Sequence, residues 1–173
     1  MAADPFPLRH QTEVLLATDA GRLFAHLDDP RRLARHMERP SLMTAGASMR
    51  IETDEHLGQA VGSLIRMTGR VLGMHLSVAE TVTRRNPPHE KVWETIGEPR
   101  LLVMGAYRMG FSISQLQQGS RLVVFIDYRL PASGISKWLG WLLGRAYAAW
   151  CTRRMADDAK TAFGTPSAAA ASR

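Results

Sequence analysis

The longest helical pattern of this 173-residue chain is ISKWLGWLLGRAYAAWCTRRMADDAKTAF, residues 135–163. Its apolar residues recur at three- and four-residue intervals, the spacing of an amphipathic helix. Pro131 closes the strand expected before it, and the Ser133 hydroxyl is placed to accept a free N–H of the first helical turn. The pattern predicts a broad apolar face in the first half of the helix, made of Ile135, Trp138, Leu139, Leu142, Leu143, Ala146, Ala149 and Trp150.

The second half of this helix follows a different line. From about Cys151 the first face becomes charged, with Arg153, Asp157 and Lys160. The apolar residues of the second half lie on another line, made of Met155, Ala159, Ala162 and Phe163. Two interpretations of the first half stay open: it covers a solid core beneath a sheet, or it lines a ligand cavity.

Residues 101–130 show the clearest strand pattern, interrupted by a turn expected at residues 117–120. Apolar and polar residues alternate on both sides of this turn, which is typical of a sheet with one buried and one solvated face. The inward parity is Leu101, Val103, Tyr107, Met109, Phe111, Ile113, Leu122, Val124, Ile126, Tyr128 and Leu130, and the outward parity includes Arg108, Ser112, Ser114, Arg121, Asp127 and Arg129.

The region before residue 101 predicts shorter elements. Asp19 is the expected N-cap of a helix at 21–27, and Asp28-Asp29-Pro30 opens a second short helix that ends at Pro40. Asn86-Pro87-Pro88 marks a turn, because each proline lacks a donor for the sheet. Further strands are predicted at 11–16, 49–53, 63–72, 75–84 and 91–96, with another turn at 97–99.

This order of elements predicts an α+β fold with a seven-stranded antiparallel curved sheet, two short helices and a long C-terminal helix. A twisted sheet of seven strands curls partly into a barrel, and its inner face needs a cover. Only the helix at 135–163 is long and apolar enough to provide it, so a cavity between sheet and helix is expected. Residues 1–163 are predicted to form one domain, and residues 164–173 a disordered tail.

Three stretches resemble the START/Bet v 1-like superfamily, also called SRPBCC or polyketide cyclase-like. Residues 17–34 resemble the opening strand, the helix and the Asp-Pro joint of the superfamily. Asn86-Pro87-Pro88 resembles the turn between its central strands, and residues 119–130 resemble its last strand before the helix. The resemblance covers nearly the whole chain and implies a helix-grip fold with a hydrophobic ligand cavity. Members of the superfamily include lipid carriers, hormone binders, aromatase/cyclases and chaperone-associated modules.

Charge and composition limit the expected partners. The net charge is +6, but the basic residues are scattered and no nucleic-acid-binding motif accompanies them, so no nucleic-acid partner is expected. The apolar run at 138–144 lies between Lys137 and Arg145 and is far shorter than the ~20 residues that span a bilayer. The N-terminus also lacks the apolar region of a secretory signal. A cytoplasmic protein is therefore predicted.

The sequence carries no recognisable catalytic or cofactor motif. The six histidines show neither HxH nor HExxH spacing, and neither a glycine-rich phosphate loop nor a GxSxG motif is present. Cys151 is the only cysteine, so neither an intramolecular disulfide nor a cysteine-based metal site forms within one chain, and a buried inert thiol is expected. We therefore predict no metal, no cofactor and no assigned catalytic residue, and favour a protein that is not an enzyme.

The candidate site residues are those predicted to face the space between sheet and helix. Methionine adapts its shape to a ligand, and tyrosine adds one hydrogen bond to an apolar wall. The alternative is that these residues only fill the core. The predicted ligand-binding residues are Met67, Tyr107, Met109, Phe111, Ile126, Tyr128, Trp138, Leu139, Leu142 and Ala146.

Three charged residues are candidate polar groups of the cavity. Glu80 shares one strand face with Val78 and Val82, and Glu94 shares its strand face with two apolar residues in the same way. If these faces point inward, the two carboxylates are buried. Burial would raise their pKa unless an arginine such as Arg70 pairs with them. The alternative for both glutamates is a surface salt bridge across strands.

The leading functional hypothesis is the binding or transport of a hydrophobic small molecule or lipid between the sheet and the C-terminal helix. One alternative is an enzyme of the polyketide cyclase/aromatase type, in which Glu80 and Glu94 transfer protons. A second alternative is a membrane-surface lipid module. Trp138, Trp141, Tyr147 and Trp150, together with Lys137 and Arg145, also suit a helix that lies at a membrane interface.

Overall fold

The structure is a computed structural model of the chain and describes residues 5–30, 48–71, 74–132 and 134–166. The second short helix, predicted up to Pro40, falls mainly on residues 31–47, outside the described residues. Most of the tail predicted to be disordered also lies outside them. The elements are β1 (Leu8–Leu16), α1 (Ala20–Leu27), β2 (Ser48–Thr53), β3 (Leu64–Val71), β4 (Met74–Asn86), β5 (Glu90–Arg100), β6 (Tyr107–Leu116), β7 (Gly119–Tyr128) and α3 (Gly134–Phe163).

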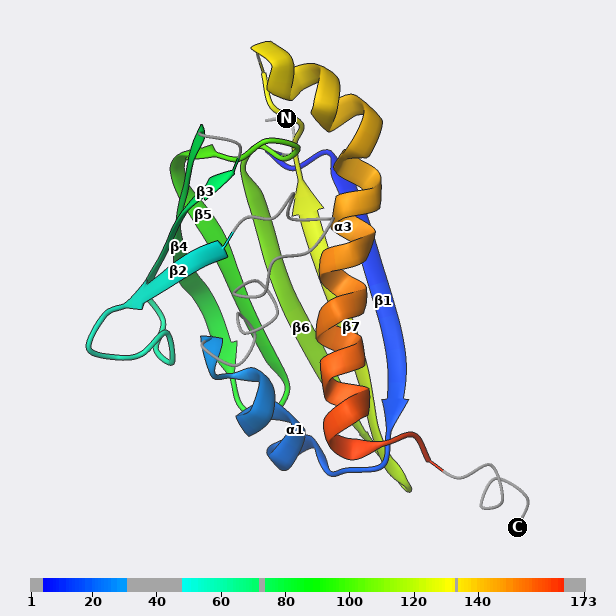
Figure 1. Cartoon of the computed structure of the whole chain (residues 1–173). Coiled ribbons are helices and arrows are strands. Elements are labelled where there is room, and N and C mark those ends of the chain that lie inside the picture. Colours follow the sequence, from blue (N-terminus) through cyan, green and yellow to red (C-terminus); the bar gives the residue numbers. More distant parts are fainter. Residues whose placement is uncertain (1–4, 31–47, 72–73, 133, 167–173) are drawn as a thin grey trace.

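The seven strands form one antiparallel sheet in the order β1-β7-β6-β5-β4-β3-β2. The sheet curves, and α3 runs along its concave side, where it packs mainly against β1 and β7 (Figure 1). The short helix α1 packs against β6 near the C-terminal end of α3. The predicted α+β architecture, with a seven-stranded antiparallel sheet and a long C-terminal helix, is confirmed.

The alternation in β6 and β7 has the predicted register. The inward residues of both strands are buried from Tyr107 to Ile113 and from Leu122 to Tyr128, whereas Ser112, Ser114 and Arg121 are exposed. Asp127 is an exception, because it lies on the outer parity but is only 3% exposed. Its carboxylate accepts hydrogen bonds from Arg9 and Arg108, whose side chains cover it.

Two predicted boundaries near residue 100 are wrong. Residues 97–99 are not a turn, because β5 continues through them to Arg100. Residues 101–106 are not part of β6; they form a loop instead. Its end is fixed by the Gly105 N–H, which donates to the Arg129 carbonyl at 2.9 Å, and by the Arg129 N–H, which donates to the Ala106 carbonyl at 3.0 Å.

The predicted apolar face in the first half of α3 is also wrong. The residues that α3 buries there are small ones at four-residue intervals, namely Gly140, Gly144 and Ala148. A Cβ on Gly140 would lie 2.6 Å from Pro131 Cδ and 3.1 Å from the Val103 carbonyl oxygen, so a larger side chain does not fit. This close approach turns the large apolar residues away from the sheet. Ile135, Trp138, Leu142, Leu143 and Ala146 are exposed, and Leu139, Ala149 and Trp150 are half-buried.

The second half of α3 follows the predicted line more closely. Met155 and Ala159 are buried, Phe163 is half-buried beside the His26 ring, and only Ala162 is exposed. Thr152 continues the stripe of small residues toward β1, where its hydroxyl lies 3.0 Å from His10 Nδ1. Within the described ranges, no helix is long and apolar enough to cross a membrane.

Candidate functional site

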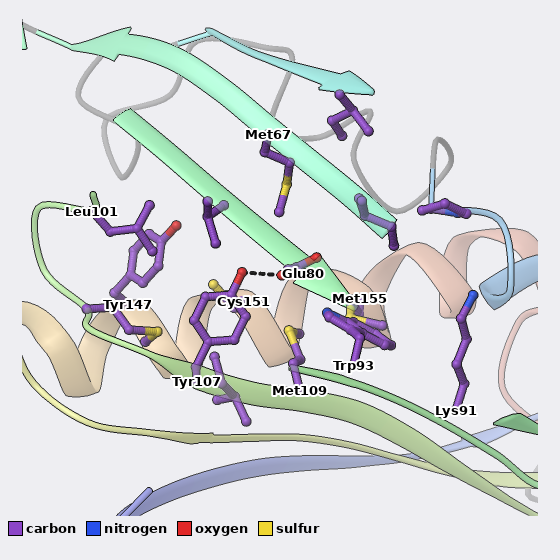
Figure 2. Close-up of a pocket in the computed structure, with 16 residues that line it drawn as sticks. Met67, Glu80, Lys91, Trp93, Leu101, Tyr107, Met109, Tyr147, Cys151 and Met155 are labelled. Carbon is purple, nitrogen blue, oxygen red and sulfur yellow. Dashed lines mark hydrogen bonds between the residues drawn. The ribbon is translucent and has the colours of Figure 1, made fainter. Parts of the chain in front are cut away.

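A cavity of about 100 Å³ lies between the concave face of the sheet and the middle of α3 (Figure 2). Residues from β2 to β7, from α3 and from the loop at 101–106 line it. Most of them are apolar, and four are methionines. The lining residues are Pro30, Ile51, Ile65, Met67, Val78, Glu80, Lys91, Trp93, Leu101, Met104, Tyr107, Met109, Ile126, Tyr147, Cys151 and Met155.

The sheet side of the cavity agrees with the sequence analysis. Met67, Tyr107, Met109, Ile126 and Glu80 all line it. The parity that placed these residues on one face of their strands therefore brings them together in space. Phe111 and Tyr128 share this inward parity and are buried in the core, outside the cavity wall.

The helix side differs from the prediction. Trp138, Leu142 and Ala146 are exposed to solvent, and Leu139 is half-buried away from the cavity. Their place is taken by Tyr147, Cys151 and Met155, which recur at four-residue intervals along another line of α3. The stripe of small residues sets the rotation of the helix, and this rotation decides which line faces the cavity.

Two of the three predicted polar groups lie elsewhere. Arg70 is exposed, and its Nη2 lies 2.8 Å from His75 Nε2 on the neighbouring strand. Glu94 is half-buried on the opposite face of β5 from Trp93, opposite Arg108 of β6. Of the two candidate glutamates, only Glu80 lines the cavity, because Trp93 points into it and the side chains at positions 93 and 94 point to opposite faces of the sheet.

Glu80 forms the polar centre of the cavity with Tyr107. The Tyr107 hydroxyl donates a hydrogen bond to the Glu80 carboxylate, and Glu80 is only 4% exposed (Figure 2). Burial raises the pKa of Glu80 to about 7, although hydrogen bonds from Tyr107 and Trp93 and the charge of Lys91 oppose the rise. Burial and the adjacent Glu80 raise the pKa of Tyr107 well above 10. Near neutral pH the pair therefore holds a neutral phenol beside a carboxyl group that gains and loses a proton.

A second pair of polar groups lies on the helix side. Burial raises the pKa of Tyr147, and the neighbouring Cys151 raises it further. Burial also raises the pKa of the Cys151 thiol to about 12, so the thiol stays protonated. Because the thiolate is the reactive form of cysteine, this agrees with the expectation of an inert thiol.

A buried ion cluster closes the end of the cavity next to α1. Lys91 Nζ donates to both the carbonyl and the carboxylate of Asp28, each at 2.7 Å. Arg85 Nη2 donates to the same carboxylate at 2.7 Å. Arg85 and Lys91 are cross-strand neighbours in β4 and β5, where two like charges alone would be unfavourable. The Asp28 carboxylate binds both cations, and the cluster fixes the end of α1 against the sheet.

Neither a protein-family model nor a curated protein sequence matches the chain. Solved structures do match it over most of its length. Ara h 8.0201 is 9% identical, with 89% of this chain and 98% of that chain covered and a TM-score of 0.57. The Zhui aromatase/cyclase from Streptomyces sp. R1128 is 14% identical, with 94% and 98% covered and a TM-score of 0.57. The major latex-like protein 151 from Panax ginseng is 11% identical, with 90% and 97% covered and a TM-score of 0.53.

The chain has the Bet v 1-like helix-grip fold. The predicted resemblance is confirmed at the level of the fold. At 9–14% identity these neighbours establish the architecture of the helix-grip protein and not its ligand or reaction.

Several lining residues of the helix-grip cavity were missed by the sequence analysis. Trp93 follows the apolar Val92 in the sequence, so parity alone does not predict its face; it points inward beside Met109, its partner across β5 and β6. The four-residue interval of Tyr147, Cys151 and Met155 was visible in the sequence, but the larger apolar residues of α3 outweighed it. No local sequence pattern predicts that Lys91 and Met104 are buried. The burial of Lys91 depends on Asp28, and that of Met104 depends on the loop at 101–106. Among the residues that the structure describes, no three His, Cys, Asp or Glu side chains form a metal-binding group.

Proposed function

We propose that this helix-grip protein binds a compact hydrophobic small molecule between the sheet and α3, with Tyr107 and Glu80 as its polar anchor. The observation that carries the proposal is a largely apolar cavity whose centre holds one buried, hydrogen-bonded phenol and carboxyl pair. Apolar walls with a few fixed polar groups are the usual design of small-molecule sites. The helix-grip fold supports the proposal, because it leaves space between sheet and helix.

The lining indicates the chemistry of the ligand. The cavity of about 100 Å³ is smaller than the roughly 300–1,000 Å³ typical of sites for drug-sized ligands. Met67, Met104, Met109 and Met155 allow some expansion, because methionine side chains change shape at low cost. Protonated Glu80 donates a hydrogen bond to a carbonyl, and ionised Glu80 accepts one from a hydroxyl. A compact aromatic or aliphatic molecule with one hydroxyl or carbonyl group fits these features.

Filling the cavity is expected to weaken ligand binding without unfolding the protein. Cys151→Leu adds bulk from α3 into the empty space, so we expect it to weaken binding of the fluorescent probe 2-naphthol by about tenfold while changing stability by less than ~1.5 kcal/mol. Probe fluorescence measures the affinity, and urea unfolding measures the stability.

Ala159→Leu is the matched control, because Ala159 is fully buried on the same helix but does not line the cavity. This variant is expected to lose ~1–3 kcal/mol of stability and to keep its affinity for 2-naphthol. The proposal fails if the folded wild type does not bind 2-naphthol, or if Cys151→Leu binds it as well as the wild type does.

A second candidate function is proton transfer of the polyketide cyclase/aromatase type. The observation that favours it is the pKa of about 7 for Glu80, because a general acid or base works best when its pKa lies near the operating pH. The Tyr107 hydroxyl is fixed beside it and is able to orient a substrate carbonyl. The substrate class that fits this arrangement and the cavity of about 100 Å³ is a short poly-carbonyl chain.

Removing the titrating carboxyl tests this second function. Glu80→Gln keeps the size of the side chain and cannot transfer the proton, so turnover of a linear poly-β-ketone is expected to fall about 10²–10⁴-fold. Product formation is followed by chromatography. Glu94→Gln, on the other face of the sheet, is the matched control and is expected to keep full turnover. Full activity of Glu80→Gln, or no turnover by the wild type, contradicts the enzymatic function and leaves the binding function in place.

A further inference from the structure

The first three turns of α3 expose a large apolar surface. Ile135 is 81% exposed, Trp138 76%, Trp141 74% and Leu142 67%. The two tryptophan rings pack edge to face, with 6.4 Å between the ring centroids, so they form one patch. We name these four residues the tryptophan face. Contiguous exposed patches of large apolar residues mark interaction sites, because exposing them to water is unfavourable.

The fold itself exposes the tryptophan face. Gly140 and Gly144 face Pro131, Leu130 and Val103 at distances that leave no room for larger side chains. The helix therefore presents its smallest residues to the domain and its largest ones to solvent. The first turns of α3 also project past the end of the sheet (Figure 1). The tryptophan face thus stands at one end of the molecule, where a flat surface can reach it.

The charge of this part of α3 has a single sign. Residues 134–156 contain Lys137, Arg145, Arg153 and Arg154 and no aspartate or glutamate. The side chains of these four cations are exposed. Tryptophan beside lysine and arginine is typical of helices at a lipid interface, because the indole ring lies at the headgroup level and the cations bind anionic headgroups.

A groove adjoins this end of the helix. It has a volume of about 570 Å³ and lies between the start of α3, the loop at 101–106 and the ends of β4 and β5. Both apolar and charged residues line it, among them Glu98, Arg100 and Arg129. Leu101 and Met104 line both this groove and the inner cavity. The groove at this end and the inner cavity therefore share part of their walls.

We propose that the tryptophan face docks on the surface of an anionic lipid bilayer, with the first half of α3 lying in the headgroup region. A second copy of the chain fits this face less well. A two-fold contact through it would bring the Lys137 and Arg145 side chains of both copies close together, with no carboxylate in residues 134–156 to compensate them. The inference rests on the surface alone and holds whether or not the cavity binds a ligand.

Vesicle co-sedimentation of the full chain tests this inference. The wild type is expected to bind vesicles of phosphatidylcholine mixed with phosphatidylglycerol about tenfold or more tightly than vesicles of phosphatidylcholine alone. Trp138→Ser/Trp141→Ser is expected to weaken binding to the anionic vesicles about tenfold or more. Lys137→Glu/Arg145→Glu is expected to lose the preference for anionic vesicles. Circular dichroism confirms that each variant is folded.

Leu15→Ser/Val61→Ser is the matched control, because these exposed apolar residues lie on β1 and in the loop before β3. This variant is expected to bind anionic vesicles as the wild type does. Three results overturn the proposal: the folded wild type stays in the supernatant with both vesicle types, the tryptophan variant binds as tightly as the wild type, or light scattering shows a wild-type dimer that the tryptophan variant dissociates and that binds no vesicles.

Discussion

Replacing Asp28 by asparagine is expected to lower the free energy of unfolding by about 3–5 kcal/mol, because it removes the carboxylate that Lys91 and Arg85 both bind in a buried ion cluster. Lys91 is 1% exposed and donates two hydrogen bonds to Asp28. Burial lowers the pKa of Lys91, and Asp28 opposes this effect. Burial raises the pKa of Asp28, but Arg85 and Lys91 outweigh it and hold that pKa below its usual range. Without this carboxylate, Lys91 and Arg85 lose the ion-pair partner that they share.

Urea unfolding of Asp28→Asn against the wild type measures this effect. Asp157→Asn is the matched control, since it removes one carboxylate from the exposed pair with Lys160 and is expected to cost at most ~1 kcal/mol. The double variant Asp28→Asn/Lys91→Met removes the buried ammonium as well and is expected to be more stable than Asp28→Asn alone. A double variant no more stable than the single one would show that the cost does not come from an unpaired lysine.

The second large effect concerns pH. Folding raises the pKa of Glu80 from its ordinary value of 4.5 to about 7, so the native state binds more protons than the unfolded state between these values. The free energy of unfolding therefore falls as the pH rises through this window. Since one pKa unit corresponds to about 1.4 kcal/mol, the contribution of Glu80 falls by about 3 kcal/mol from below pH 4.5 to above pH 7.

Glu80→Gln removes this titration and keeps an acceptor for the Tyr107 hydroxyl. Relative to the wild type, the variant is therefore expected to gain about 3 kcal/mol of stability as the pH rises through the same window. Urea unfolding of both proteins at a series of pH values gives the difference. Glu94→Gln, on the other face of the sheet, is expected to keep the pH dependence of the wild type. A difference between Glu80→Gln and the wild type that is constant with pH would mean that folding does not raise the pKa of Glu80.

The sheet was largely predictable from the sequence. In β6 and β7 each side chain alternates strictly between two faces, so the inward residues, from Tyr107 to Tyr128, follow from parity alone. The same rule placed Glu80 with Val78 and Val82. It missed the loop at 101–106, because the apolar residues there continue the alternation although the backbone leaves the sheet.

The sequence by itself determined the order of the described elements, the parity of β6 and β7 and the extent of the long helix, because these depend on local spacing and on turn residues. Only the tertiary structure decided which side of α3 meets the domain. A helix wheel ranks faces by hydrophobicity, but Gly140 and Gly144 face the domain because Pro131 and the Val103 carbonyl approach too closely for any side chain. The same contact exposes Trp138 and Trp141 and turns Tyr147, Cys151 and Met155 toward the cavity. The side of α3 that lines the cavity is therefore decided by close packing between segments far apart in the sequence. No local sequence pattern records this packing.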